Sequence, residues 1–275
     1  CICCILVIYF LLLFLTAPHF RTIQKCFKVK YIVTLIMRLQ ICLTARSDPA
    51  YIDFNHSYHL ASMIYRAIER ADPELSLELH TPLTFKFFTF SRLMVEGRKF
   101  RKEGDRMKLL SPKVHFFFST LRNYIGVALV EGLLEKPEVK VGNAEFVVSE
   151  IKVMKEKEIG RKEKFVTLSP INVTTVEENG RRRIVDLYPN NPKFYENLRK
   201  NLVKKYVAFH GKEPENDELR IRVISSKPVR VQLKNTFHRA SLMVFEAEGS
   251  RELLEVGYKA GFGERNSMGF GMVKA

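Results

Sequence analysis

The most restrictive feature of the 275-residue chain is an order of expected strands and helices that occurs twice. Alternating side chains predict strands, and apolar side chains three or four positions apart predict the buried face of a helix. The first set has strands over 38–45, 85–93, 113–120 and 145–154, with helical apolar stripes over 60–68 and 121–129. The second set has strands over 165–176, 219–224, 229–233, 241–248 and 268–274, with helices over 192–209 and 250–258. Both sets follow the β-α-β-β-α-β order of a ferredoxin-like domain, the second with one more strand.

This order predicts an α+β protein made of two tandem ferredoxin-like (RRM-like) domains, over 37–157 and 158–275. The helix over 192–209 has the clearest ends. Asn191 can cap it, Pro192 suits its first turn, and Gly211 can end it. Its buried face is expected to consist of Phe194, Leu198, Leu202 and Tyr206.

The first 36 residues differ from the rest of the chain. Residues 1–17 carry no charge, the charged residues that follow up to Lys30 are all basic, and no acidic residue precedes Asp48. Seventeen uncharged residues is the lower limit for a membrane-spanning helix, and a secretory signal would begin with basic residues. The chain starts with Cys1, and its first methionine is Met37. We interpret 1–36 as a non-native upstream extension, with a hydrophobic membrane anchor or a buried helix as the alternatives.

The net charge and the number of cysteines indicate which kind of binding partner and which cellular compartment to expect. Lys and Arg number 45 against 30 Asp and Glu, which gives a formal net charge of +15 and favours a polyanionic partner. Four of the five cysteines lie in 1–36, so only Cys42 remains in the body of the chain. A disulfide framework and a paired-cysteine zinc motif are therefore excluded. We expect a cytoplasmic protein without a metal site.

A glycine-rich segment, GFGERNSMGFG, occupies residues 261–271 between the last expected helix and strand. It is not a Walker A loop, because no Gly-Lys-Ser/Thr follows, and Asn266 stands at the third glycine of the dinucleotide fingerprint. Glycine permits positive φ and a close approach of the backbone to a ligand. Two interpretations stay open: the loop binds RNA phosphate through its amides, or it is a tight turn that closes the domain. The glycines concerned are Gly261, Gly263, Gly269 and Gly271.

Basic and polar side chains alternate with apolar ones on two of the expected strands. Arg230, Gln232 and Lys234 share one side of the strand over 229–233, and Arg220 and Arg222 share one side of the strand before it. Runs of charge in loops are usually solvated surface. We therefore expect these five strand residues, rather than the charged loops, to bind RNA.

The segment GFGERNSMGFGMVKA, together with the tandem ferredoxin-like order, resembles the repeat-associated mysterious proteins (RAMPs). Within that superfamily the chain resembles the archaeal type of the sixth Cas family, the CRISPR-associated endoribonucleases that cut repeat transcripts into guide RNAs. The resemblance runs from Met37 to the C-terminus and includes FVTLSPI at 165–171 and EIKV at 150–153. It implies CRISPR repeat RNA as the partner, other CRISPR effector subunits and a second copy of the chain as further partners, no membrane and no cofactor.

In that family a metal-independent cut uses a Tyr on the first helix, a His shortly after it and a Lys just beyond. This chain has Tyr65, His80 and Lys86 at those positions. The resemblance therefore implies that these three residues are catalytic. Some relatives without the His bind RNA and do not cut it, so noncatalytic binding of repeat RNA is the alternative function.

The pattern around these residues agrees with exposed polar roles. Tyr65 lies roughly 130° from the centre of the apolar stripe on its helix, at 100° per residue. Lys86 would face away from Phe85 and Phe87 on an alternating strand, which fits either a solvated surface or a site.

Attack by the 2′-hydroxyl of the RNA on the adjacent phosphate leaves a 2′,3′-cyclic phosphate and a 5′-hydroxyl. It needs a proton acceptor, a proton donor and positive charge beside the phosphorane. An imidazole such as His80 can be acid or base near neutral pH. Tyr65 would act as a base only if a cation such as Lys86 lowered its pKa, and Lys86 itself suits the stabilising role. Which of His80 and Tyr65 accepts the 2′-hydroxyl proton stays open.

Overall fold

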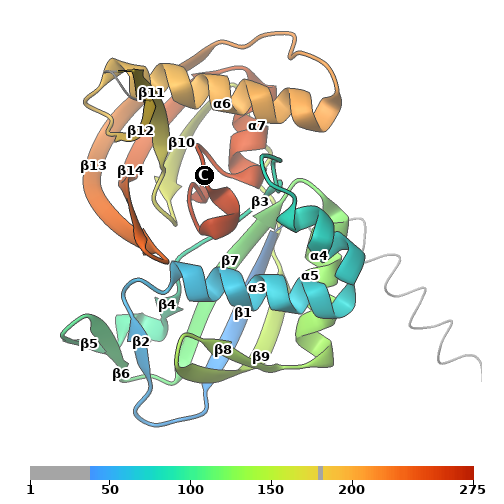
Figure 1. Cartoon of the computed structure of the whole chain (residues 1–275), viewed down its shortest axis with the longest axis vertical. Coiled ribbons are helices and arrows are strands. Elements are labelled where there is room, and N and C mark those ends of the chain that lie inside the picture. The colour runs from blue at the N-terminus through green and yellow to red at the C-terminus, as the bar shows by residue number, and fades with distance from the viewer. Residues whose placement is uncertain (1–37, 179–181) are drawn as a thin grey trace, which may run out of the picture. The chain divides into compact units, whose positions relative to one another are not determined.

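The structure is a computed structural model that describes residues 38–178 and 182–275. These residues form a six-stranded and a four-stranded antiparallel sheet, with two helices packed on each, and two smaller sheets of three and two strands (Figure 1). The segment 1–36 lies outside the described residues, and its interpretation as an upstream extension stays a prediction. Among the residues that the structure describes, no helix is long and apolar enough to cross a membrane.

The first sheet has the strand order β3-β7-β1-β9-β8, and β4 also pairs with β7. Its strands are β1 (Arg38–Ala45), β3 (Phe88–Phe90), β4 (Met94–Val95), β7 (Lys113–Thr120), β8 (Glu138–Val141) and β9 (Ala144–Val153). Helices α3 (Ser57–Ala71) and α5 (Asn123–Glu135) lie side by side against it (Figure 1). They approach closely because Gly132 of α5 has no Cβ, which would lie 1.8 Å from the backbone oxygen of Ala67.

The second sheet has the strand order β13-β14-β10-β15. Its strands are β10 (Lys162–Thr167), β13 (Leu219–Leu233), β14 (Thr236–Gly249) and β15 (Val273–Lys274). Helices α6 (Pro192–His210) and α7 (Arg251–Ala260) cover it, and a hairpin of β11 (Val173–Glu178) and β12 (Arg182–Leu187) precedes α6 (Figure 1). A core of buried aliphatic and aromatic side chains, including Phe165, Phe194 and Phe245, lies between sheet and helices.

Both halves have the same topology. When the four strands of each β-α-β-β-α-β unit are numbered along the chain, each sheet has the order 2-3-1-4. The predicted fold class, α+β with two tandem ferredoxin-like domains, is confirmed. The ends of α6 are also as predicted: the Asn191 side chain accepts a hydrogen bond from the Lys193 backbone N–H at 3.0 Å, and Gly211 has φ 69°.

Several predicted strands differ in extent from the observed ones. The strand expected over 85–93 is confined to β3, because Phe87 has φ 54° and interrupts the extended backbone. The one expected over 165–176 is two strands, β10 and β11, that belong to different sheets. The last strand is only β15, because positive φ at Gly269 and Gly271 keeps the preceding backbone irregular.

Other elements have no counterpart in the prediction. Helix α4 (Pro73–His80) follows α3, a 3-10 turn η1 spans Glu96–Arg98, and a second one, η2, spans Asn266–Met268. The basic segment before β7 forms a hairpin of β5 (Phe100–Glu103) and β6 (Arg106–Leu109), and β6 also pairs with β2 (Tyr51–Asp53).

The strands expected over 219–224 and 229–233 are a single strand, β13, with a bulge. Val223 lies opposite Phe245 and Ser225 opposite Val244, so β13 has one extra residue there. Arg222 lies opposite Glu246 of β14, and Arg230 lies opposite Arg239 of the same strand. Glu246 and Arg239 are seven residues apart, and successive residues of a strand point to alternate faces, so an odd separation places them on opposite faces. Arg222 and Arg230 therefore also lie on opposite faces of the sheet.

His56 connects the start of α3 to the first sheet in a way that requires a neutral imidazole. Its Nδ1 lies 2.9 Å from the Asp53 carbonyl oxygen, and its Nε2 accepts a hydrogen bond from the Leu93 backbone N–H at 3.0 Å. The imidazole can make both bonds only when Nδ1 carries a proton and Nε2 carries none. Burial lowers the pKa of His56 from 6.5 to about 4.

We expect this histidine to make the fold sensitive to acid. Between pH 6.5 and 4 the unfolded imidazole binds more protons than the folded one, so the free energy of unfolding falls as the pH falls. The loss from this group is on the order of 3 kcal/mol. Urea denaturation at pH 7, 5.5 and 4 measures it. His56→Gln should lack this part of the pH dependence, whereas His59→Gln, at a half-buried neighbour, should keep it; equal profiles for both would contradict the assignment.

Candidate active site and RNA-binding cleft

The structure brings Tyr65, His80 and Lys86 together from three consecutive elements. Tyr65 is on α3, His80 is the last residue of α4, and Lys86 is on the loop that leads to β3. Helix α4 begins where it does because Asp72 accepts a hydrogen bond from the Leu75 backbone N–H and Pro73 occupies the first turn. This short helix returns the chain toward α3, so that His80 reaches Tyr65.

Contacts with Tyr65 and with the backbone of α4 fix the orientation of His80. The ring centroids of Tyr65 and His80 lie 4.9 Å apart, and Phe88 packs on Tyr65 from another side at 5.7 Å. His80 Nδ1 lies 2.7 Å from the Ser76 carbonyl oxygen, which can only accept a hydrogen bond. Nδ1 therefore carries a proton, and Nε2 is the atom that can exchange one with a substrate. The His80 side chain is exposed.

The Lys86 ammonium is held near His80 by hydrogen bonds to the loop that follows His80. It donates a hydrogen bond to the carbonyl of Thr81, the residue after His80, and another to Thr84 Oγ1 at 2.7 Å. Lys86 was expected on an alternating strand, and this expectation is wrong because β3 begins only at Phe88. Its position comes instead from a tight loop in which Leu83 and Phe87 have positive φ. Strained backbone of this kind is common at functional sites.

Within this group, the surroundings shift the pKa values of Tyr65 and Lys86. Burial raises the pKa of Tyr65, and a hydrogen bond with Ser267 acts in the opposite direction with a smaller effect. Lys86 is not among the causes, so the structure gives no support to a phenolate produced by that cation. Burial lowers the pKa of Lys86, and the nearby carboxylate of Glu78 opposes this. Tyr65 is therefore suited to donate a hydrogen bond.

The four glycines of the Gly-rich segment have a structural requirement of their own. Each has positive φ, and a Cβ would lie 2.5 Å from the Asn266 side chain at Gly261 and 2.3 Å from the Asn172 backbone oxygen at Gly263. At Gly269 a Cβ would lie 2.7 Å from the Phe90 ring, and at Gly271 it would lie 2.0 Å from the Phe262 backbone oxygen. Packing within the protein is enough to explain these glycines, and their contact with RNA stays a prediction.

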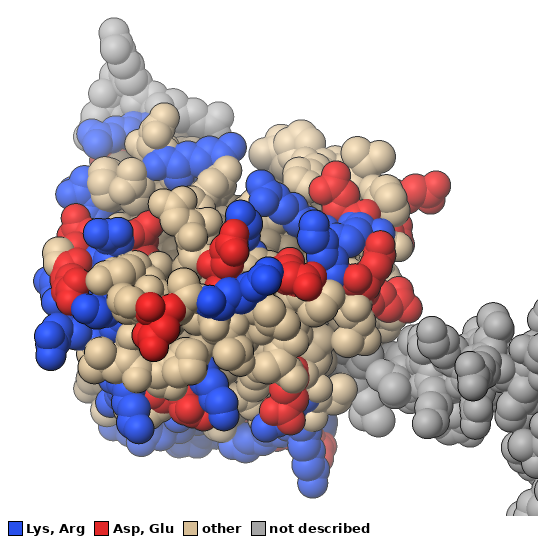
Figure 2. All heavy atoms as spheres, turned by 90° about the horizontal axis from the view of Figure 1, so that it is seen from below, with Lys and Arg blue, Asp and Glu red and all other residues tan. Residues whose placement is uncertain are grey.

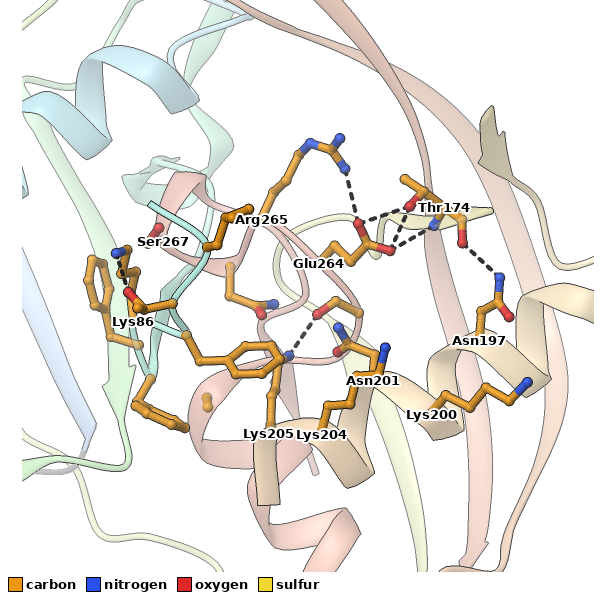
Figure 3. Close-up of a pocket in the computed structure, with 18 of the residues that line it drawn as sticks. Lys86, Thr174, Asn197, Lys200, Asn201, Lys204, Lys205, Glu264, Arg265 and Ser267 are labelled. Carbon is orange, nitrogen blue, oxygen red and sulfur yellow. Dashed lines mark hydrogen bonds and ion pairs between the residues drawn. The ribbon is translucent and has the colours of Figure 1, made fainter. Parts of the chain in front are cut away.

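A buried lysine of α6 supports the same segment. Lys205 Nζ donates hydrogen bonds to the carbonyl oxygens of Gly261 and Gly263 at 2.6 and 2.7 Å (Figure 3). Burial lowers the pKa of Lys205 to about 7, and Glu264 opposes the shift. Lys205 thereby ties the Gly-rich segment to the same helix that lines the cleft described next.

A cleft of about 750 Å³ extends from Lys86. One side is the loop before β3, the opposite side is α6, and the Gly-rich segment lines the space between them (Figure 3). Besides Lys205, helix α6 contributes four polar side chains at positions i, i+3, i+4 and i+7, which lie on one face of a helix. We call them the α6 polar row: Asn197, Lys200, Asn201 and Lys204.

The α6 polar row was not among the predicted site residues, because α6 was predicted from its apolar stripe alone. The signal was present in the sequence: two amides and two lysines repeat at helical spacing beside that stripe.

The five strand residues expected to bind RNA lie outside the cleft lining and are not on one surface. Arg222 pairs with Glu246 at 2.7 Å, and the Arg230 guanidinium lies 3.7 Å from the centroid of the Phe237 ring. Gln232 donates a hydrogen bond to the Lys234 carbonyl. Since the bulge in β13 separates Arg220 and Arg222 from Arg230 and Gln232, one RNA strand cannot contact all of them on one sheet face. Their binding of RNA stays a prediction.

The distribution of charge does not by itself indicate the path of RNA. On the face shown in Figure 2, acidic side chains lie among the basic ones rather than beside a separate basic patch. Within residues 38–178 and 182–275, no three His, Cys, Asp or Glu side chains are grouped as metal ligands. The geometry of the cleft is therefore more informative than the net charge.

Comparison with known proteins agrees with this architecture. Two family models match, CRISPR-associated protein Cas6, N-terminal, over residues 51–152 and CRISPR associated protein Cas6, C-terminal, over residues 154–275. The chain is 42% identical over 225 residues to CRISPR-associated endoribonuclease Cas6 1 of Methanocaldococcus jannaschii, covering 81% of this chain and 86% of that protein. It is 41% identical over 224 residues to CRISPR-associated endoribonuclease Cas6 of Pyrococcus furiosus, covering 81% and 83%.

A solved structure described as an RAMP protein binding different RNA substrates is also similar, with a TM-score of 0.80 and 37% identity over 86% of this chain and 98% of that one. The tandem fold and the matches in both halves define a CRISPR-associated protein of the RAMP class. The chain belongs to the Cas6 family of CRISPR-associated endoribonucleases. The resemblance found in the sequence is thereby confirmed.

Proposed function

We propose that this chain binds CRISPR repeat RNA and cuts the precursor transcript into guide RNAs without a metal ion. The observation that carries the proposal is the group formed by Tyr65, His80 and Lys86, of which Lys86 lines the end of the cleft, in a member of the Cas6 family. The group contains a proton-transfer residue, a hydrogen-bond donor and a cation, which are the parts that phosphoryl transfer by an internal nucleophile needs.

In the proposed reaction the 2′-oxygen forms a bond to the adjacent phosphorus, and the bond from phosphorus to the 5′-oxygen breaks. The 2′-hydroxyl loses its proton, and the 5′-oxygen gains one from His80 Nε2. Tyr65 keeps its proton because burial raises its pKa, so it orients the 2′-hydroxyl while that proton passes to water. The Lys86 ammonium stabilises the charge of the phosphorane. The products carry a 2′,3′-cyclic phosphate and a 5′-hydroxyl.

The test is cleavage of labelled repeat RNA in EDTA. We expect cleavage to proceed, and the downstream fragment to be phosphorylated by polynucleotide kinase without prior phosphatase treatment, because its 5′ end is a hydroxyl. A 2′-deoxy substitution at the cut site should block the reaction, since it removes the nucleophile. Cleavage that depends on added Mg²⁺, or that survives the 2′-deoxy substitution, would contradict the proposed mechanism.

The same assay tests the alternative, a Cas6 protein that binds repeat RNA without cutting it. The description of the similar structure as an RNA-binding RAMP protein is the observation that favours this alternative. RNA that is bound with a measurable Kd but recovered intact would support it. Contacts of RNA with the β13 residues and the Gly-rich segment, association with other CRISPR effector subunits and formation of a homodimer remain further predictions of the family resemblance.

A further inference from the structure

The α6 polar row faces the loop of Lys86 across the cleft but has no part in the chemistry proposed above. Figure 3 shows Lys86 and Ser267 on one side and the four α6 side chains on the other. Lys204 is exposed and makes no hydrogen bond or ion pair with any other described residue. Lys200 is exposed, and its one ion pair within the described part of the chain is with Glu196 on its own helix. An exposed pair of this kind is weak, so both ammonium groups are available to an anion.

The two amides of the row differ in what they bind. Asn197 Nδ2 donates a hydrogen bond to the Thr174 carbonyl oxygen at 2.8 Å, which holds α6 against β11. Asn201 Oδ1 is shielded from solvent and has no hydrogen-bond partner among the described residues. A buried acceptor without a donor is unfavourable, and a ligand that brings an N–H or O–H group relieves this cost.

Acidic groups near the row are already engaged. Glu264 is the single carboxylate among the residues that line the cleft. Its oxygens accept hydrogen bonds from the Thr174 backbone N–H and hydroxyl at 2.8–3.0 Å, and Arg265 lies 3.5 Å away. The carboxylate is thus engaged with Thr174 and Arg265, and the basic side chains leave the cleft lining net positive.

We propose that the α6 polar row binds the nucleotides adjacent to the scissile phosphate as a single strand, with phosphates on Lys200 and Lys204 and an unpaired base edge on Asn201. The proposal rests on the proposed function, because that function places the scissile phosphate at Lys86, where the cleft begins. A single strand fits the chemistry best, since unpaired bases expose the donors of their Watson–Crick edges to an amide oxygen, whereas paired bases use those donors on each other.

The first experiment measures binding of a repeat RNA with a 2′-deoxy nucleotide at the cut site, which cannot be cleaved. The double variant Lys200→Ala/Lys204→Ala should bind more weakly at low salt. Its plot of log K against log salt should be flatter by about 1.4 units, because each lost phosphate contact removes about 0.7 for a single strand. Lys212→Ala is the matched control, since Lys212 is exposed just beyond the same helix and lies outside the cleft lining. It should keep the wild-type slope.

The second experiment locates the RNA. With the photo-crosslinking residue p-benzoyl-phenylalanine in place of Asn201, irradiation of the complex should attach the protein to a nucleotide within about three positions of the cut. A crosslink farther away, no crosslink despite tight binding, or an unchanged salt slope in the double variant would each overturn the proposal.

These outcomes are separable from failure of the proposed function. If the wild-type chain cuts RNA in EDTA but the double variant binds like wild type, the function stands and the α6 polar row is not its binding site. If the wild-type chain does not cut RNA but the double variant binds weakly and the crosslink maps to the expected position, the site stands in a noncatalytic protein.

Discussion

Replacing His80 by Ala should slow cleavage of repeat RNA by about 10²–10⁴-fold, the usual contribution of general acid–base catalysis. The Kd for repeat RNA should stay close to the wild-type value, because the His80 side chain is exposed and, among the described residues, its one hydrogen bond is to the Ser76 carbonyl on its own helix. Single-turnover rates at saturating protein, together with equilibrium binding, measure both effects. His210→Ala, which removes another exposed imidazole outside the cleft lining, should leave the rate unchanged.

The role of His80 as the acid has a sharper test. Sulfur in place of the 5′-oxygen gives a leaving group that departs as a thiolate and needs no proton. If His80 protonates the 5′-oxygen, His80→Ala should cut this substrate almost as fast as the wild-type chain does. If the variant remains equally slow on both substrates, His80 is the base and the proposed assignment is wrong. Tyr65→Phe and Lys86→Ala should have smaller effects that do not add, because the three residues act as a unit.

The sequence was sufficient for the parts of the fold that depend on local signals. The ends of α6 were predictable because the cap at Asn191 and the positive φ at Gly211 act within a few residues. The strand β1 was predictable to the residue, because its alternation is set by burial on one face of the sheet. The order of the elements then limited each half to a ferredoxin-like topology.

What the sequence did not show depends on contacts between distant residues. In the sequence, basic and apolar residues alternate on both sides of Val223, so nothing there indicates a bulge. In the structure, the bulge after Val223 places Arg230 on the other face of the sheet from Arg222. The positive φ of Phe87 is equally hidden, since nothing in its side chain requires it. Both cases concern a backbone conformation that tertiary packing imposes on residues with other preferences.

Part of the candidate site was likewise predictable from the sequence, and part required the structure. Tyr65, His80 and Lys86 came from a motif, and the structure shows the contacts that the motif only implied. The α6 polar row could be noticed as a stripe, but its meaning depends on the loop that faces it from the other half of the chain. A polar helix face is usually solvated, so without that loop there was no reason to assign it a ligand.

A substitution at Gly263 in the Gly-rich segment should cause a large loss of folding stability. A Cβ at this position would lie 2.3 Å from the Asn172 backbone oxygen, at a φ of 72° that side chains rarely adopt. The oxygen cannot move away easily, because it accepts a hydrogen bond from the Glu264 backbone N–H at 2.8 Å. The Asn172 side chain also donates hydrogen bonds to the Asp186 carboxylate and the Arg239 carbonyl oxygen. We expect Gly263→Ala to lower the free energy of unfolding by about 3–5 kcal/mol, as strain and overpacking add.

The control for Gly263 separates backbone strain from the clash. Gly211 has nearly the same conformation, φ 69°, but a Cβ there would have no neighbour within 4 Å. Gly211→Ala should therefore cost only about 1 kcal/mol, so the difference between the two variants in urea denaturation measures the clash itself. The same pair tests the role of the loop in RNA binding. If Gly263→Ala lowers RNA affinity only in proportion to its unfolded fraction, the glycine is required for packing. If it unfolds like Gly211→Ala but binds RNA far more weakly, the backbone at Gly263 approaches the RNA directly, and packing is not the reason that this position needs glycine.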